Sequence, residues 1–542
     1  MDFNLADIAQ AVADAVPDRE YIVHGETRIT YAQFMDRARQ CAWVLHNAGL
    51  GCRTERSGLG GHESGQDHLA LYLHNGREFL EANIGAYAAR VAPFNVNYRY
   101  VDEELVALLD DLDAVGVVFH SSFAPILARL SLPKVRLWLQ VDDGSGQPLL
   151  PGAVWYEDAL ALASTERLPV EPSPDDLYIL CTGGTTGKPK GVLWRQADIW
   201  VAALGGLNAP SGGEYGSLNQ IATEAASRRG LPTIVIAPLM HGAGQWSALA
   251  SLSRGNTIVL PREVTRLDAA DVLSTCEQER VVQMMVVGDA FTRPLLDEYE
   301  RQPYDLSSLK VVVNGGAGLS VASRERLKSA WPSAMLMDGL GSSETGTTAV
   351  SLSDNIEPGV FTLAPSARIL NTDRTRVLSH GEEELGWSAN FGPIPLGYYR
   401  DEIKTEQTFP VIEGVRYVVP GDRVRYREDG RVELHGRDSA TINSGGEKIF
   451  AEEVEQALMQ HPAVRDVLVC ARPSQRWGSE VAAVVSLRAN MAADVEALLA
   501  EAAQHIARYK LPKIIIFRDE IRRSPAGKAD YRWAQQEVNQ SL

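Results

Sequence analysis

The chain has 542 residues, 45% hydrophobic and 23% charged, an ordinary globular composition that allows for about three or four domain-sized units. Asp and Glu outnumber Lys and Arg by 70 to 52, and the net charge of −18 disfavours non-specific binding to nucleic acid or to an anionic membrane. No stretch approaches the roughly 18 apolar residues of a membrane span. The N-terminus does not resemble a signal peptide, and the five cysteines form no CxxC or Cys/His cluster. These features argue against a disulfide framework or a structural zinc site and predict a cytoplasmic protein without integral membrane association.

The charge is unevenly distributed along the chain. Residues 437–542 contain 14 basic and 14 acidic side chains, so the whole net negative charge lies in residues 1–436. Within the tail, residues 508–532 hold eight basic and three acidic side chains. Two interpretations stay open for this basic segment: a solvated face, or a cationic surface that meets a polyphosphate ligand.

The predicted elements alternate between helices and strands through most of the chain. Leu5, Ile8, Val12 and Val16 recur at helical spacing and predict a first helix. Apolar runs separated by helix-length segments predict strands at 69–73, 115–119, 178–181, 233–237, 257–260, 284–287 and 310–313, with a helix at 77–91. This alternation predicts an α/β protein with layered, largely buried sheets. Two polar, Gly-rich segments, 57–67 and 208–230, are candidates for mobile flaps.

The pattern changes after residue 436. Helices are predicted at 452–459 and 494–507, and strands at 464–470, 481–487 and 514–517. We therefore expect a large N-terminal domain, residues 1–436, and a small α+β C-terminal domain, residues 437–542.

A glycine-rich loop directly after the strand at 178–181 carries the strongest chemical signal. Its sequence, residues 182–191, is TGGTTGKPKG. Glycines let backbone N–H groups approach phosphate oxygens, threonine hydroxyls add donors or a metal ligand, and lysines offset polyphosphate charge. The loop is not a Walker A motif, because Pro189 follows Lys188 where Ser or Thr would stand. An ordinary surface turn is the alternative, and it does not account for the paired threonines and lysines. The candidate phosphate-binding residues are Thr182, Gly183, Gly184, Thr185, Thr186, Gly187, Lys188 and Lys190.

This loop resembles the phosphate-binding motif of the adenylate-forming enzymes, which include acyl-CoA synthetases, luciferases and amino-acid adenylation domains; Gly183 replaces the usual serine. Further segments resemble the other motifs of that family in order: 238–242 (PLMHG), 314–317 (NGGA), 341–345 (GSSET), 420–422 (PGD), 436–437 with 444–449 (GR, SGGEKI) and 523–528 (RSPAGK). The resemblance covers about residues 20–533. It implies that the small C-terminal domain is mobile.

The resemblance also implies roles for individual residues. Lys528 would be the catalytic lysine that stabilises charge on the α-phosphate and the substrate carboxylate. Glu344, with Thr185, would be a ligand of Mg²⁺, which prefers carboxylate and phosphate oxygens. His241 would form a wall or gate of the acyl site. Taken alone, each of these residues would have an ordinary structural explanation.

The remaining site residues would bind the nucleotide. Asp422 would accept hydrogen bonds from the ribose hydroxyls, and Arg437 would contact the ribose and help to fix the domain orientation. The other nucleotide-side candidates are Gly315, Gly316, Ala317, Asp338, Gly339, Leu340, Gly341, Ser342, Ser343, Gly445 and Gly446. Leu340 replaces the aromatic residue that stacks on adenine, and either Asp438 or Ser439 is the hinge.

The activity that this resemblance implies is a two-step ligation. A carboxylic acid reacts with ATP to give acyl-adenylate and pyrophosphate, and coenzyme A then takes the acyl group and releases AMP. Residues 240–244 offer no anion to an amino-acid ammonium, whose unpaired burial costs several kcal/mol, so an apolar acid is favoured. Several segments look similar to actinobacterial enzymes for long-chain fatty acids or steroid side-chain acids. The expected acyl pocket is formed by residues 241–246, 288–295 and 315–317.

Three alternatives remain open. An enzyme that adenylates an aryl or amino acid would donate it to a carrier protein, and no carrier-like segment follows Lys528. A luciferase-like oxygenase would share the adenylation step. A non-enzymatic ATP-binding regulator would not require Lys528. A homodimer is a candidate assembly, and the sequence does not determine the exact acid.

Overall fold

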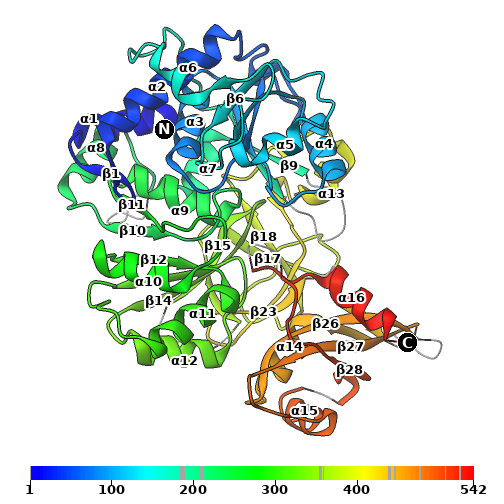
Figure 1. The fold of residues 1–542 in the computed structure, drawn as a ribbon. Helices are drawn as coiled ribbons and strands as arrows, with labels where there is room; N and C mark the ends of the chain where they lie inside the picture. Colours follow the sequence, from blue (N-terminus) through cyan, green and yellow to red (C-terminus); the bar gives the residue numbers. More distant parts are fainter. Residues whose placement is uncertain are drawn as a thin grey trace.

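The computed structural model describes residues 2–182, 190–207, 213–352, 357, 359–437, 441–444, 447–474, 478–506, 508–523 and 527–541. Two sheets and the helices packed on them form a large N-terminal domain. A third sheet forms a small C-terminal domain, coloured orange and red at the lower right of Figure 1. The predicted fold class, an α/β protein with a large and a small domain, is confirmed.

The first sheet of the large domain has fifteen strands among the described residues, and β10–β14 run parallel at its centre. In spatial order the strands are β2 (Thr27–Thr30), β1 (Glu20–His24), β11 (Thr257–Leu260), β10 (Pro232–Val235), β12 (Gln283–Val286), β13 (Val311–Gly315), β14 (Met335–Ser342), β15 (Gly346–Leu352), β16 (Val360–Leu363), β23 (Val432–Arg437), β22 (Asp422–Tyr426), β18 (Gly386–Phe391), β21 (Val415–Val418) and β20 (Val411–Ile412); β17 (Ala367–Leu370) pairs with β18.

The second sheet has eight described strands and carries the glycine-rich loop. Its order is β19 (Gly397–Tyr398), β9 (Lys190–Arg195), β8 (Leu177–Thr182), β4 (Ala92–Asn95), β3 (His68–Tyr72), β5 (Ala114–His120), β6 (Leu137–Val141) and β7 (Val154–Trp155). β8 and β9 form an antiparallel pair, so the loop that joins them begins and ends at the same end of these two strands.

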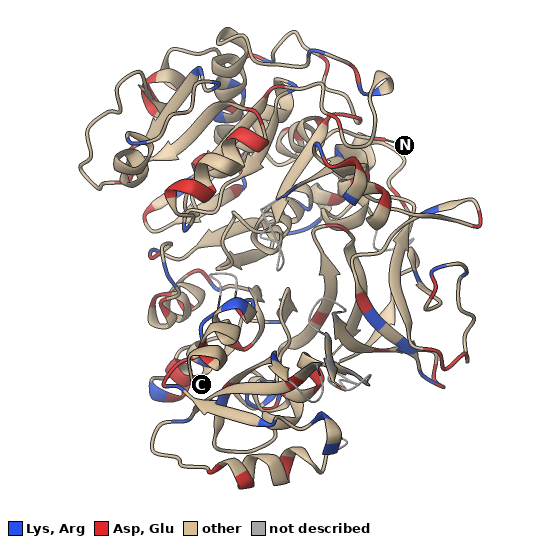
Figure 2. Ribbon diagram, turned by 90° about the vertical axis from the view of Figure 1, so that its right-hand side faces the viewer, with Lys and Arg blue, Asp and Glu red and all other residues tan. Residues whose placement is uncertain are grey.

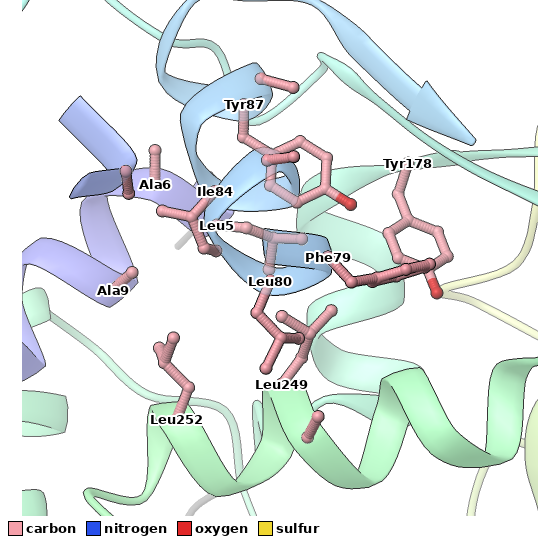
Figure 3. Close-up of a cluster of buried hydrophobic side chains, with 14 of the residues drawn as sticks. Leu5, Ala6, Ala9, Phe79, Leu80, Ile84, Tyr87, Tyr178, Leu249 and Leu252 are labelled. Carbon is pink, nitrogen blue, oxygen red and sulfur yellow. The ribbon is translucent and has the colours of Figure 1, made fainter. Parts of the chain in front are cut away.

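The helices of the large domain pack between the two sheets and on the outer face of each sheet. They are α1 (Leu5–Ala15), α2 (Tyr31–Asn47), α3 (Arg77–Ala88), α4 (Asp102–Asp111), α5 (Ala124–Leu127), α6 (Tyr156–Ala161), α7 (Gln196–Ala203), α8 (Leu218–Ser227), α9 (Gly242–Ser253), α10 (Ala269–Gln278), α11 (Gly288–Arg301), α12 (Val321–Ala330) and α13 (Glu402–Thr408). Figure 3 shows Leu5, Ala6 and Ala9 of α1 near Leu80 and Ile84 of α3 and Leu249 and Leu252 of α9. Burying each such leucine stabilises the fold by about 1.5–3 kcal/mol.

The small domain has its own sheet and its own cores. The sheet contains β25 (Glu447–Phe450), β24 (Thr441–Ser444), β27 (Gly478–Leu487), β26 (Val464–Ser474) and β28 (Ile514–Phe517). Alternating residues of β26 and β27 pack under α14 (Ala451–Leu458) and α15 (Val495–Ala502) on one face, and under α16 (Tyr531–Gln540) on the other. Because both faces are covered, the central parts of β26 and β27, residues 467–470 and 481–485, are apolar, and the domain forms a self-contained body.

Most predicted elements are present, and one prediction was wrong. Segment 208–230 was a candidate flap, but its residues 218–227 form α8, with Ile221 and Ala225 buried in the core shared with α1. In segment 57–67, the Arg56 guanidinium donates to the Glu63 carbonyl at 2.7 Å, and Gln66 bridges to Cys52. None of the described helices is long and apolar enough to cross a bilayer.

Four of the eight basic side chains in residues 508–532 form ion pairs with described residues. Lys510 pairs with Glu453 at 2.5 Å, Arg518 with Glu537 at 2.6 Å, and Arg523 with Asp466 at 2.7 Å. Basic and acidic segments accordingly alternate on the small domain at the bottom of Figure 2. For these ion-paired side chains, the pairing favours the solvated face of the two interpretations left open by the sequence.

Candidate active site

The two ends of the glycine-rich loop are held by the β8–β9 pair, in which Thr182 lies opposite Lys190. Residues Gly183, Gly184, Thr185, Thr186, Gly187 and Lys188 lie outside the described residues. The Lys190 ammonium group pairs with the carboxylate of Asp401, the N-cap of α13, and lies 5.6 Å from the centre of the Tyr398 ring. The loop therefore ends on a lysine whose position is set by the segment around α13.

Glu344 lies in the turn between β14 and β15 and is held in place on both sides. Its backbone N–H donates to the Ser342 hydroxyl at 3.2 Å, and the Tyr398 hydroxyl donates to its Oε1 at 3.1 Å. The Trp194 indole N–H donates to the neighbouring Ser343 carbonyl at 2.9 Å. This turn lies against β9, beside the end of the phosphate loop.

The chemistry at Glu344 suits a magnesium ion that arrives with a nucleotide. No cluster of three or more His, Cys, Asp or Glu side chains able to hold a metal occurs in the described part of the chain. Mg²⁺ usually binds to one or two carboxylates and otherwise to substrate phosphates and water, rather than in an all-protein cage. A single oriented carboxylate near a phosphate-binding loop fits that requirement.

The nucleotide-side turn is built by the parallel pairing of β13 with β14, which places Asn314 opposite Asp338 and Gly315 opposite Gly339. The Asn314 amide donates to Asp338 Oδ1 at 2.6 Å and to the Ala317 carbonyl at 3.0 Å, while Gly288 N–H donates to Asn314 Oδ1 at 2.7 Å. Asp338 is buried and also pairs with Arg324. The structure therefore brings together, where the C-terminal end of β13 pairs with β14, the residues Gly315, Gly316, Ala317, Asp338, Gly339 and Leu340.

Glycine is also required where β14 turns into β15. A Cβ on Gly341 would lie 2.1 Å from the Gly346 carbonyl oxygen, which no side chain tolerates. The strands also shift register between Leu340 and Gly341. Gly341 thus lets the chain fold back tightly and present residues 342–344 at the end of the strand.

Asp422 and Arg437 lie directly opposite each other in the antiparallel pair of β22 and β23. Asp422 is buried and follows Gly421, whose φ of +112° glycine adopts without strain. The predicted ribose carboxylate and arginine are therefore neighbours in the sheet. The hinge candidates Asp438 and Ser439, and Gly445 and Gly446, lie outside the described residues.

The loop that carries Lys528 docks against the large domain. A Cβ on Gly527, where φ is +70°, would lie 3.0 Å from both the Val287 carbonyl oxygen and the Ala290 Cβ. On its own domain the loop is tied by a bridge between Arg523 and Ala529. The Arg523 guanidinium in turn makes two hydrogen bonds to Asp466, at 2.7 and 2.8 Å.

His241, in the large domain, is the N-cap residue of α9. It lies close enough to Lys528 of the small domain for the charge of that lysine to affect its protonation. Burial, with the positive charges of Lys528 and Arg99, lowers the pKa of His241 to about 3. Its Nε2 is buried and has no hydrogen-bond partner among the residues described. His241 is consequently a neutral imidazole at physiological pH, with Lys528 close enough for its charge to act on it.

A cavity of about 230 Å³ lies beside this contact. One wall is apolar, including Ile236, Pro238 and Phe291, and Arg99 and Glu263 contribute charged groups. Gly527 of the small domain also lines it. Of the expected acyl-pocket segments, only 288–295 reaches this cavity, through Ala290 and Phe291.

Comparisons with known proteins agree with this geometry. Residues 9–386 match the family described as AMP-binding enzyme, and residues 453–528 match the AMP-binding enzyme C-terminal domain. The chain belongs to the AMP-binding enzymes.

Individual relatives align along almost the whole chain. A protein of Mycobacterium avium named medium-chain acyl-CoA ligase Mig is 52% identical over 540 residues, which is 99% of this chain and 98% of the relative. A 3-oxocholest-4-en-26-oate–CoA ligase of Rhodococcus rhodochrous is 38% identical over 550 residues, with 99% and 96% covered. The solved structure of the anthranilate CoA ligase AuaEII with anthranoyl-AMP has a TM-score of 0.84 at 21% identity, covering 100% of this chain and 98% of that one, and it shows a shared fold.

Membership of this family confirms the expected class of reaction. The protein is an AMP-forming acid–thiol ligase that makes an acyl-CoA through an acyl-adenylate and uses ATP, Mg²⁺ and CoA. The roles of individual site residues remain predictions.

Sequence reasoning missed several residues of this AMP-binding enzyme that lie at the site. Tyr398 and Asp401 contact Glu344 and Lys190, although about 200 residues separate them along the chain from the phosphate loop. Arg99 lies close enough to His241 for its positive charge to help lower the pKa of that histidine. The segment Gly-Tyr-Tyr-Arg-Asp at 397–401 follows no periodic pattern, so only a structure could find it.

Proposed function

We propose that the enzyme activates apolar carboxylic acids, fatty acids of medium to long chain first, and passes them to CoA. The 52% identical relative named for medium-chain acyl groups supports this choice. The 38% identical relative named for a sterol side-chain acid supports a steroid acid as the second candidate. Residues 240–244 offer no carboxylate to an amino-acid substrate.

In the first half-reaction, the acid's carboxylate attacks the α-phosphorus of ATP and pyrophosphate leaves. Lys528 is the group we assign to the charge that develops on the α-phosphate and the attacking carboxylate. The observation that carries this assignment is the docking of Gly527 against Val287 and Ala290 beside His241. Neutral His241 would offer its buried Nε2 to the acyl carboxylate without adding a competing charge.

Other groups would hold the nucleotide. The phosphate loop would bind the β- and γ-phosphates, the turn at 315–317 and 338–343 the base, and Asp422 with Arg437 the ribose. Glu344 would hold Mg²⁺, assisted by Thr185. Mg²⁺ would supply positive charge that offsets the negative charge of the phosphates.

In the second half-reaction the CoA thiol attacks the acyl carbon and AMP leaves. We propose that the small domain, residues 437–542, swings away from the N-terminal domain, residues 1–436, at Asp438 or Ser439. Because Gly527 lines the 230 Å³ cavity, withdrawal of its loop would open that cavity for the pantetheine arm. Exposed Arg99 at its rim suits a phosphate of CoA.

A cytoplasmic location agrees with the use of ATP and CoA as substrates. Nucleic acid is not proposed as a partner, because the net charge is −18 and four basic groups of the tail are ion-paired. The homodimer stays a prediction, which sedimentation of the purified enzyme would check.

The test is a screen of acids with and without CoA, measured by release of pyrophosphate and AMP. Octanoic, dodecanoic and palmitic acids, a sterol side-chain acid, benzoic acid and phenylalanine cover the alternatives. We expect CoA-dependent turnover with the aliphatic acids, and slow turnover limited by adenylate release without CoA. Turnover confined to phenylalanine or benzoic acid would overturn the proposal in favour of an aryl- or amino-acid-activating enzyme.

A further inference from the structure

Strand β19 brings a distant part of the chain to the end of the phosphate loop. It contains only Gly397 and Tyr398, which pair antiparallel with Leu193 and Val192 of β9. The approach is close, because a Cβ on Gly397 would lie 2.5 Å from Thr405 Cγ2 of α13 and 2.9 Å from the Gly61 carbonyl oxygen. Tyr398 is therefore delivered to the site by backbone pairing and by tight packing.

The Tyr398 side chain is buried, with 5% of the residue exposed, and its orientation is fixed. Its backbone N–H donates to the Thr405 hydroxyl at 2.9 Å, and its ring packs edge-on against Phe409 with the centroids 5.9 Å apart. Both partners belong to the segment of α13: the backbone hydrogen bond fixes the place of residue 398 beside that helix, and the ring contact restrains its side chain.

From this position Tyr398 contacts two charged groups that face the phosphates in the proposed site. Its hydroxyl donates to Glu344 Oε1 at 3.1 Å, and the Lys190 ammonium lies 5.6 Å from the centre of its ring. Asp401, three residues further on, pairs with the same ammonium. An anionic metal ligand and a phosphate-loop cation are thus oriented by one short segment.

We propose that Tyr398 is a positioning residue for metal-bound ATP, holding the Glu344 carboxylate by its hydroxyl and the Lys190 ammonium over its ring. The proposal rests on the proposed function of this site. While the Tyr398 hydroxyl donates to Oε1, the Glu344 carboxylate keeps one rotamer and its other oxygen is available to bind the metal. Hydrogen bonds of this kind to a metal-binding carboxylate commonly change metal affinity by about 10-fold or more when they are removed.

The test is Tyr398→Phe, which deletes the hydroxyl and keeps the ring. We would measure binding of Mn²⁺ to the enzyme–ATP complex by electron paramagnetic resonance, and binding of ATP without metal by calorimetry. We expect Mn²⁺ affinity to fall about tenfold while metal-free ATP binding stays within about twofold. Equal affinity for Mn²⁺ in both proteins would overturn the proposal, as would an equal loss of metal-free ATP binding.

Tyr399→Phe is the matched control. Tyr399 is the neighbouring residue, and its hydroxyl donates at 2.8 Å to Asp113, a carboxylate outside the proposed site. This variant should bind Mn²⁺ and ATP like the wild type. If it lowers Mn²⁺ affinity as much as Tyr398→Phe does, the effect is one of packing and the proposal fails.

A double-mutant cycle with Glu344→Gln separates direct from indirect action. If Tyr398 acts through Glu344, its replacement has no further effect on Mn²⁺ affinity once Glu344 is neutral. Additive losses would contradict that route. These binding measurements need no acid substrate, so failure of the proposed acyl specificity in the acid screen leaves their outcome readable.

Discussion

The two domains supply their parts of the proposed site in contrasting ways. On the large domain, the nucleotide-side turn is continuous with the central sheet and is locked by buried hydrogen bonds among Asn314, Asp338 and Ala317. On the small domain, Lys528 lies on a loop fastened to its own body by the Arg523–Asp466 pair and touching the large domain through Gly527. The first is a platform built into the central sheet, and the second is a group on a separately folded domain, which we propose moves away between the two steps.

This contrast suggests which step each part serves. The small domain has its own two cores, so it can change orientation without losing its packing. Its further contacts with the large domain include the 3.7 Å approach of the Arg293 guanidinium to the Met459 sulfur, and the rings of His435 and Phe450, whose centres lie 6.2 Å apart. Damage to the platform should therefore impair both half-reactions, and damage to the Lys528 loop only the first.

Replacement of Lys528 by Ala should have the largest effect. We expect adenylate formation to slow by roughly 100-fold or more, because the charge on the α-phosphate loses its partner. Thioester formation from supplied acyl-adenylate should stay within about twofold of wild type. Rapid-quench measurement of each half-reaction provides the check. Lys513→Ala, an exposed lysine of the same domain, is the control and should leave both steps unchanged.

Equal losses in the two half-reactions would contradict the division of labour between platform and loop. They would mean that Lys528 also serves thioester formation, or that the small domain does not leave the site between the steps.

The Asp338→Asn variant tests the platform. Asp338 is 7% exposed at its side chain and pairs with Arg324, which is 10% exposed, so the change leaves a buried guanidinium without its counter-charge. Loss of one partner of such a pair typically destabilises a protein by about 3–5 kcal/mol. We expect a lower Tm and a roughly tenfold loss of kcat/KM in both half-reactions, because the turn that receives the base relaxes. Asp305→Asn breaks an exposed pair with Arg280 and should change neither quantity.

If Asp338→Asn slows only adenylate formation, the platform is not shared between the steps. Assays at temperatures where circular dichroism shows an intact fold would separate this outcome from unfolding.

The sequence predicted the parts of the molecule that depend on local patterns. Apolar runs located β3, β5 and β8 to within a few residues, since buried parallel strands are apolar throughout. The helix α8 was missed because its buried positions, Ile221 and Ala225, are too few to stand out in a polar segment. α16 was missed for the same reason, with Ala534 and Val538 as its buried residues.

The site was predicted through motifs, and its supporting contacts were not. The residues of the nucleotide turn were found, but the register that places Asn314 opposite Asp338 is a property of the sheet. Tyr398 reaches Glu344 only because a two-residue strand joins the edge of the second sheet. Such contacts join residues far apart in sequence, and no local periodicity encodes them.

The last prediction, with no expected effect on activity, concerns the protonated carboxyl group of Glu455 in the small domain. Burial, together with the nearby Glu452 carboxylate, raises the pKa of Glu455 to about 8, and its Oε1 accepts a hydrogen bond from Val469 N–H at 2.9 Å. The folded domain therefore keeps this proton at pH values where an unfolded chain releases it. Its stabilising contribution is complete below the unfolded value of about 4.5 and is lost as the pH rises through about 8.

Glu455→Gln keeps the carbonyl acceptor and removes the titration, so it should leave both half-reactions unchanged. In calorimetry we expect the small-domain transition of the wild type to fall relative to the variant by roughly 10 °C or more between pH 5 and 8. Glu501→Gln changes a glutamate of α15 that contacts His505; it is the control and should follow the wild type. Coincident profiles for wild type and Glu455→Gln would mean that this carboxyl is solvated. Water would then reach the core of the small domain, which would argue against a tightly packed domain that moves as a rigid unit.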